Sequence, residues 1–204
     1  MQTALNEKRR IIFIDEVVFT RNSCLKRAYS HKGENATINL SCIPSGYMSV
    51  IAGISYERGK ELIEIQHNAV NADDFESFLY ELSERHQNRK VAIFMDNLQV
   101  HHTQQVKNLA QSLDMMLIYN KVNEPDLNPI EIIFSVAKNH YKKARFSHEN
   151  NSEDYNMAEL IEKAFSSIKH SSIKNSINHS MRLLGLPSVD SVFPKSDIKQ
   201  VNER

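Results

Sequence analysis

The alternation of hydrophobic and polar positions predicts a run of strands followed by helices that alternate with single strands. Apolar, β-branched runs bounded by turn residues are typical of buried strands, and apolar residues three or four positions apart are typical of amphipathic helices. We expect strands at 11–19, 36–43, 47–56, 61–66, 91–95 and 115–119, and helices at 71–86, 103–113, 128–145 and, with a break within 166–176, at 154–184. This order predicts an α/β fold, a three-layer domain in which helices flank a mixed central sheet.

The length of the chain is sufficient for one such domain and a small appendage. Folding of the 204 residues buries roughly 70% of the surface of the unfolded chain, which supplies a core without disulfide or metal staples. The two cysteines, Cys24 and Cys42, therefore need not form a disulfide framework. We expect the α/β domain at 1–146 and a helical extension at 147–204, which ends in a tail after Pro187.

Composition and charge narrow the class of protein. The hydrophobic fraction of 41% and the charged fraction of 25% exclude a disordered or collagen-like chain. No signal-type segment follows Met1 and no apolar run approaches the ~20 residues of a membrane span. We therefore expect no membrane partner and a reducing compartment, the nucleus in a eukaryote and otherwise the cytoplasm.

The charges of the chain are balanced, since Lys+Arg 25 equals Asp+Glu 25. A nucleic-acid module is usually basic overall, but a carboxylate site lowers the sum while leaving basic surface elsewhere.

Two aspartates stand where a charge needs a partner. Asp15 interrupts the apolar run 11–19, and Asp96 ends the apolar strand 91–95. A buried carboxylate costs several kcal/mol unless it is paired or holds a metal, and no basic residue is adjacent to either aspartate. Carboxylates are the ligands that Mg²⁺ and Mn²⁺ prefer. The simpler alternatives are an exposed strand-end acid for Asp15 and a turn residue for Asp96.

Glu131 is the best candidate for a third acid. It follows Asn128, a predicted helix cap, and Pro129, a residue typical of the first helical position. The same spacing matches a capping box, in which Glu131 would only stabilise the helix by roughly 1 kcal/mol. The sequence leaves both interpretations open.

The helix that begins at Asn128 also carries cations on the face of Glu131. Lys138, Lys142 and Arg145 follow Glu131 at intervals that return to one edge of a helix. Such an edge is suited to binding the phosphates of a nucleic acid beside a metal site. A basic face that is simply solvated is the alternative.

Three segments of the chain resemble the catalytic blocks of mariner-superfamily transposases. They are residues 14–19, 95–102 and 125–131, and 34 residues separate Asp96 from Glu131, a spacing that this family uses. The resemblance covers about residues 11–145. The chain departs from the family pattern at Asn123 and Glu124, where an aromatic and a small residue are usual, and at Phe134, where the family has Trp. None of these departures touches the acids.

The resemblance implies a catalytic domain with the ribonuclease H-like fold that retroviral integrases share. It implies that Asp15, Asp96 and Glu131 hold two Mg²⁺ or Mn²⁺ ions and act as a DNA endonuclease and strand transferase on transposon ends. Double-stranded DNA, as transposon end and as target, and a second copy of the chain are then the expected partners. The residues expected to support the acids or the scissile phosphate are Asn97, His101, His102 and Asn128.

Two other functions remain open from the sequence. A domesticated module that keeps the fold would bind DNA or protein without catalysis, and a related nuclease would cut RNA hybrids. Transposases of this family carry an N-terminal helix-turn-helix region, whereas ten residues precede the first predicted strand here. We therefore expect either a catalytic fragment or a protein that obtains its DNA specificity elsewhere.

Overall fold

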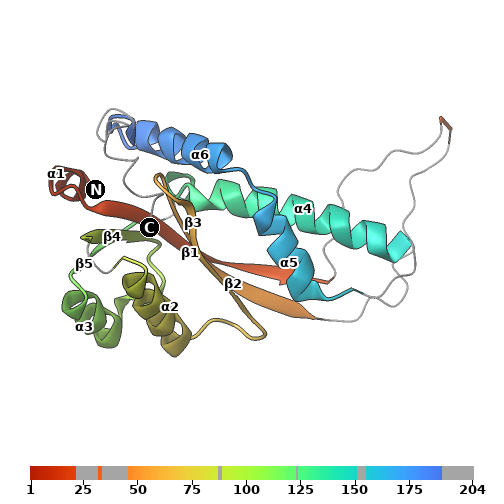
Figure 1. The fold of residues 1–204 in the computed structure, drawn as a ribbon, viewed down its shortest axis with the longest axis horizontal. Helices are drawn as coiled ribbons and strands as arrows, with labels where there is room; N and C mark the ends of the chain where they lie inside the picture. The colour runs from red at the N-terminus through yellow and green to blue at the C-terminus, as the bar shows by residue number, and fades with distance from the viewer. Residues whose placement is uncertain (22–31, 34–45, 87–88, 123, 151–154, 190–204) are drawn as a thin grey trace.

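The central sheet has five strands in the order β3-β2-β1-β4-β5. The computed structural model describes residues 1–21, 32–33, 46–86, 89–122, 124–150 and 155–189. The strands are β1 (Arg10–Thr20), β2 (Tyr47–Ser55), β3 (Gly59–Gln66), β4 (Val91–Met95) and β5 (Met115–Tyr119). β1, β2 and β3 pair antiparallel, while β4 pairs parallel with both β1 and β5. This mixed sheet confirms the predicted fold class (Figure 1). The strand predicted at 36–43 lies outside the described residues.

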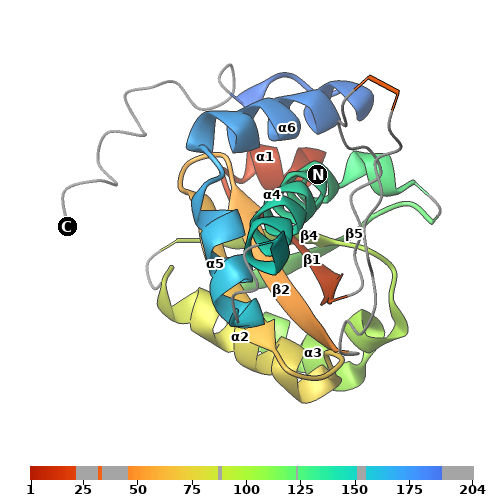
Figure 2. The same ribbon diagram turned by 90° about the vertical axis from the view of Figure 1, so that its right-hand side faces the viewer.

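Helices cover both faces of the sheet. They are α1 (Gln2–Asn6), α2 (Ala72–Glu84), α3 (Gln104–Ser112), α4 (Ile130–Asn150), α5 (Met157–Ser166) and α6 (His170–Leu183), with short 3₁₀ turns η1 (Gln99–His102) and η2 (Pro125–Leu127). Figure 2 shows α2 and α3 on one side of the sheet and α4, α5 and α6 on the other. The expected break in the C-terminal helical segment is the turn between α5 and α6.

Each layer has its own core because β1 is apolar on both faces. Ile12 and Ile14 pack toward α2 and α3, and Phe13 and Phe19 pack toward α4, α5 and α6. The C-terminal helices therefore share a core with the sheet, and the boundary expected near residue 146 falls inside α4. No described helix is long and apolar enough to span a bilayer.

Helix α2 shows how local sequence produces one of these layers. Asn71 caps the helix and forms a capping box with Asp74, which satisfies backbone N–H groups that the first turn leaves free. Its apolar stripe is fully buried: Phe75, Phe78, Leu79 and Leu82 are each 0% exposed. Burial contributes roughly 1.5–3 kcal/mol for each such side chain.

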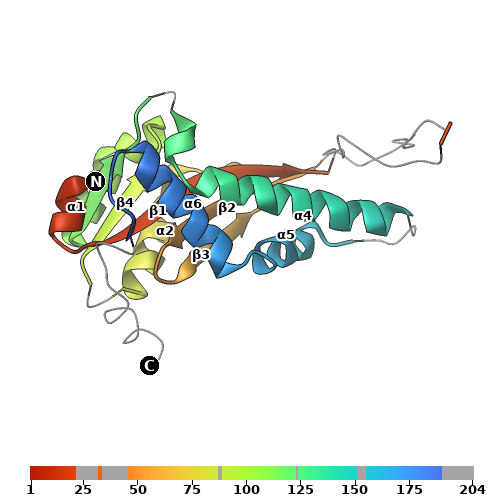
Figure 3. The same cartoon turned by 90° about the horizontal axis from the view of Figure 1, so that it is seen from above.

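Helix α4 places the third acid beside the sheet. Its buried stripe includes Ile130, Ile133, Ala137 and Tyr141, and Figure 3 shows the helix running alongside β1. This stripe holds α4 against the sheet by burial of apolar surface. Glu131 lies in the first turn of α4, at the end of the helix that faces the centre of the sheet.

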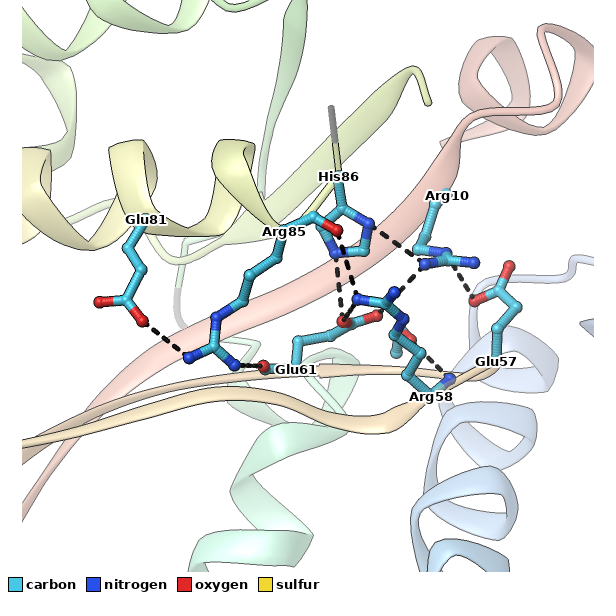
Figure 4. Close-up of polar contacts among 8 residues, drawn as sticks. Arg10, Glu57, Arg58, Glu61, Glu81, Arg85 and His86 are labelled. Carbon is cyan, nitrogen blue, oxygen red and sulfur yellow. Dashed lines mark hydrogen bonds and ion pairs between the residues drawn. The ribbon is translucent and has the colours of Figure 1, made fainter. Parts of the chain in front are cut away.

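The N-terminal end of β1 lies in a buried ionic cluster (Figure 4). We call the Arg10 cluster the group of Arg10, Glu61 and His86, whose side chains are 3%, 0% and 1% exposed. Arg10 Nη1 lies 3.1 Å from His86 Nδ1, and His86 Nε2 lies 3.1 Å from Glu61 Oε2. Arg10 also approaches Glu57 (3.7 Å). The cluster joins the end of α2 to β1 and β3.

Candidate active site

The three candidate acids line one cleft. β1 and β4 pair in parallel with Phe13 opposite Phe94, and continuing this register by two positions brings Asp96 beside Asp15. Glu131 reaches the same place from the first turn of α4. The cleft has a volume of about 430 Å³. Its lining consists of Asp15, Glu16, Asp96, Asn97, Leu98, Asn120, Lys121, Val122, Glu124, Pro125, Asn128 and Glu131.

Asp15 is a buried carboxylate surrounded by other acids. It is 7% exposed, in the middle of β1, so it is not an exposed strand-end residue. Burial is the largest cause that raises the pKa of Asp15 to about 8, and the backbone N–H of Glu16 opposes the rise. The carboxylates of Glu16, Glu131 and Asp96 add to it. Within the described residues Asp15 has no ion-pair partner. A proton or an added cation must therefore balance its charge.

Asn128 orients Asp15 and caps α4 without Glu131. Its Nδ2 donates to the carbonyl of Ile14 (3.2 Å) and lies 3.4 Å from Asp15 Oδ2. Its Oδ1 accepts from the N–H of Ile130 (3.4 Å). The backbone N–H of Asn128 donates to the carbonyl of Pro125 (2.8 Å), so the reciprocal bond that a capping box needs from Glu131 is not made. The carboxylate of Glu131 is exposed in the cleft instead.

His101 connects Asp96 to a fourth acid, Glu16. Its Nδ1 lies 2.9 Å from Asp96 Oδ1, and its Nε2 lies 3.0 Å from Glu16 Oε1. Burial opposes the charge of this imidazole, but the hydrogen bonds with Asp96 and Glu16 prevail and raise the pKa of His101 to about 9. Burial also acts against the charge of Asp96, but the bonds from His101 and from the N–H of Leu98 lower its pKa. His101 is therefore charged at neutral pH and partly balances the acids.

Asn97 and His102 hold the ends of β4 and β5 together. Asn97 Nδ2 donates to the carbonyl of Asn120, and Asn97 Oδ1 lies 3.2 Å from His102 Nε2. The ring of His102 stacks on Tyr119 with a centroid distance of 4.1 Å. These contacts support the backbone next to Asp96 and do not reach Asp15.

The three cations expected along α4 differ in exposure. Lys138 and Lys142 are half-buried at the surface. Arg145 is 2% exposed, because it lies one turn beyond the buried Tyr141. The guanidinium is therefore inside the protein, and the sequence interpretation that placed Arg145 on the exposed edge needs this correction.

Sequence reasoning overlooked Glu16, Asn120 and Lys121. Glu16 follows Asp15 in β1 and also lines the cleft, and His101 brings it into the same charge network. The sequence does indicate Glu16, because it is a second acid inside an apolar strand. Asn120 and Lys121 carry no such signal, because a polar pair after a short strand is ordinary in a turn.

The donor chemistry of the cleft fits a hard divalent cation. The carboxylates of Asp15, Asp96 and Glu131, which come from three parts of the chain, supply oxygen ligands of the type that Mg²⁺ and Mn²⁺ take. As the side chains stand, no three His, Cys, Asp or Glu residues of the described segments are close enough to hold one ion. Asp96 is engaged by His101 instead. Metal binding therefore requires the carboxylates of the cleft to move closer together than they lie in this structure.

The model of the DDE superfamily endonucleases matches residues 10–153, and the chain belongs to this family. The matched segment contains the whole sheet, the candidate acids and α4. The ribonuclease H-like architecture and the acid cleft therefore define a DDE transposase-like catalytic domain. The search of curated proteins finds no match.

Solved structures of Mos1 transposase share the fold. The pre-cleavage Mos1 transpososome superposes with a TM-score of 0.65 at 16% identity, over 94% of this chain and 60% of the Mos1 chain. The Mos1 catalytic domain with raltegravir and Mn gives a TM-score of 0.54 at 13% identity, over 90% and 88%. The intasome of simian T-cell lymphotropic virus gives 0.55 at 13%, over 79% and 49%. The chain thus spans about three fifths of the length of the Mos1 chain in the transpososome.

Proposed function

We propose that this chain is the catalytic domain of a transposase, a metal-dependent DNA endonuclease and strand transferase that acts on the ends of a mobile element. One observation carries the proposal: three acids from β1, from the end of β4 and from α4 meet in one cleft, and the most buried of them has neighbours of its own charge. The Mos1 structures that share the fold support it, since they include complexes with a transposon end and complexes with Mn or Mg.

Asp15, Asp96 and Glu131 would hold two Mg²⁺ or Mn²⁺ ions. When bound, such ions lower the pKa of a water or a terminal DNA hydroxyl and neutralise the leaving oxygen. Asn128 keeps the carboxylate of Asp15 directed into the cleft through its hydrogen bonds to β1. His101 helps to keep Asp96 ionised through the hydrogen bond that lowers its pKa. Lys138 and Lys142 would bind phosphates of the DNA that extends along α4.

The test is cleavage of DNA that carries the ends of the element, taken from the genomic sequence around the gene, with Mn²⁺. The wild-type chain is expected to nick this DNA, and Asp15→Asn, Asp96→Asn and Glu131→Gln are each expected to abolish nicking. Asp126→Asn is the matched control, because Asp126 is an exposed acid of the same segment that does not line the cleft. Cleavage that survives in all three variants would overturn the proposal.

A non-catalytic binding module is the second candidate, and one observation favours it. Asp96 pairs with His101, and the described residues contain no preassembled group of three ligands. Calorimetric titration with Mn²⁺ separates the two functions: no uptake, together with DNA binding that ignores the three acids, favours the module. Nicking of duplex DNA compared with an RNA–DNA hybrid of the same sequence separates a transposase from a nuclease of hybrids.

A further inference from the structure

The segment that follows β5 is fixed beside the acids by one buried amide. Asn120 is 7% exposed, and its backbone N–H donates to the carbonyl of Met95 (2.7 Å). Its Nδ2 donates to the carbonyl of Glu124 (2.8 Å), and its Oδ1 accepts from the N–H of Lys121 (2.8 Å). Its carbonyl accepts from Asn97. The backbone that presents Lys121 is therefore tied to the residue that precedes Asp96.

This anchored segment presents an exposed cation and an exposed apolar side chain to the cleft. The side chain of Lys121 is 74% exposed. Val122 is 67% exposed, more than any other large hydrophobic residue of the described segments. Both line the cleft that contains Asp15, Asp96 and Glu131. The exposed surfaces of Lys121 and Val122 do not contribute to the packing of the protein, so the fold itself does not explain why these two residues stand here.

Lys121 is also the one cation among the described residues that line the cleft, where the other charged groups are carboxylates. A phosphodiester that approaches such a lining meets repulsion from every other charged side chain. The ammonium is held by an exposed ion pair with Glu124 (Nζ to Oε1, 2.5 Å). Exposed pairs of this type are weak, so a phosphate can replace the carboxylate at little cost.

We propose that Lys121 is a positioning residue that binds a backbone phosphate of DNA next to the scissile phosphate, and that Val122 packs on the adjoining deoxyribose. This inference rests on the proposed function and specifies how the cleft holds the strand that it cuts. Because the segment is anchored to β4 through Asn120, the phosphate bound by Lys121 sets the position of the strand relative to Asp96.

The experiment measures the affinity of the full chain for a short fluorescein-labelled DNA duplex in Ca²⁺ at several salt concentrations. Lys121→Ala is expected to weaken binding about five- to tenfold at low salt and to flatten the slope of log affinity against log salt by about 0.9. Lys121→Arg is expected to retain both values. Val122→Ser is expected to weaken binding about two- to fivefold with the slope unchanged. The matched control is Lys107→Ala, which changes an exposed lysine of α3 that does not line the cleft and should change neither value.

Glu124 distinguishes a phosphate contact from a structural ion pair. If Lys121 serves the loop through Glu124, then Lys121→Ala and Glu124→Gln should change affinity in the same direction. If Lys121 binds phosphate, Glu124→Gln frees the ammonium and strengthens binding about twofold or more, and this gain disappears in the Lys121→Ala background. In Mn²⁺, Lys121→Ala should raise the KM for nicking more than it lowers kcat.

The two proposals fail in different ways. A wild-type chain that nicks DNA with Mn²⁺, together with a Lys121→Ala variant whose salt slope equals that of the wild type, would overturn the inference about Lys121 alone. A Glu124→Gln variant that binds more weakly would also overturn it. Nicking that survives Asp15→Asn, Asp96→Asn and Glu131→Gln would instead overturn the proposed function.

Discussion

Two groups of buried charged side chains each include a residue of β1, Arg10 in one and Asp15 in the other, and they differ in how charge is balanced. In the Arg10 cluster, Glu61 faces His86 at 3.1 Å, Arg58 at 3.8 Å and Arg10 at 4.0 Å. Burial raises the pKa of Glu61, but the hydrogen bonds from His86 and Ser55 prevail and lower it. In the acid cleft, burial and neighbouring carboxylates raise the pKa of Asp15 to about 8.

The comparison shows that burial by itself does not separate a structural charge from a functional one. Both residues are nearly removed from solvent, at 4% exposure for Glu61 as a whole residue and 7% for Asp15. Glu61 is matched by cations of the chain, so it needs nothing further from a ligand. Asp15 is not matched among the described residues, which is typical of a site that a bound cation completes.

The largest expected effect separates the two groups by activity. Asp15→Asn should reduce Mn²⁺-dependent nicking by at least about 10³-fold, because it removes a charged metal ligand. Glu61→Gln should leave kcat of the folded protein within about threefold, since the Arg10 cluster lies at the N-terminal end of β1 and none of its residues lines the acid cleft. Nicking kinetics, normalised to the folded fraction by circular dichroism, measure both. A Glu61→Gln protein that is folded and inactive would contradict this separation.

The second effect concerns stability in the Arg10 cluster. Glu61→Gln should lower the free energy of unfolding by about 3–5 kcal/mol, because it removes the buried carboxylate that faces His86 and Arg10 and leaves Arg10 with Glu57 alone. Glu81→Gln is the matched control: its pair with Arg85 is 45% and 49% exposed, and its loss should cost less than about 1 kcal/mol. Urea denaturation measures both values, and equal losses would show that the cluster is no more than a surface ion pair.

The third effect is a gain in the free energy of unfolding, opposite in sign to the loss expected for Glu61→Gln. Because the folded pKa of Asp15, about 8, lies above its ordinary value of 3.8, the folded state holds a proton that the unfolded state releases. Its contribution to stability is present below pH 4 and is lost as the pH rises toward 8. In EDTA, Asp15→Asn should therefore be more stable than the wild type at pH 7, by on the order of 4 kcal/mol.

The same pair of proteins provides the control for the third effect. The difference in unfolding free energy should shrink as the pH falls toward 4 and vanish below about pH 3, where the carboxyl is protonated in both states. Saturating Mn²⁺ should reverse the order, because the wild type gains binding energy that the variant lacks. Thermal denaturation against pH measures this, and an Asp15→Asn chain that is less stable at every pH would contradict the account of Asp15.

The smallest effect concerns the cations of α4. Lys138→Ala and Lys142→Ala should each weaken duplex DNA binding a few-fold and flatten the salt slope by about 0.9 per contact. Arg145→Ala should leave the slope unchanged and lower the melting temperature, since its guanidinium is 2% exposed. Fluorescence anisotropy and thermal denaturation separate the two outcomes. A slope change in Arg145→Ala would return that residue to the DNA-binding edge.

The local pattern of hydrophobic and polar residues was sufficient to predict most of the strands and helices. The strands at 47–56, 91–95 and 115–119 and the helices at 71–86 and 103–113 lie within one or two residues of the observed elements, because alternation and caps such as Asn71 act over a few residues. Helix α4 continues to Asn150, past the predicted end at 145. No glycine or proline stops it there, and side-chain pattern alone does not mark the end of a helix without such a signal.

The amino-acid sequence by itself determined the α/β class, the order of the elements and the positions at which acids interrupt apolar strands. The tertiary structure decided the rest. It assigned the N–H of Asn128 to Pro125 rather than to Glu131, linked Glu16 to Asp96 through His101 and buried Arg145. The physical reason is distance along the chain: helices and strands form through contacts between near neighbours, whereas partners, burial and pKa values depend on side chains that only folding brings together.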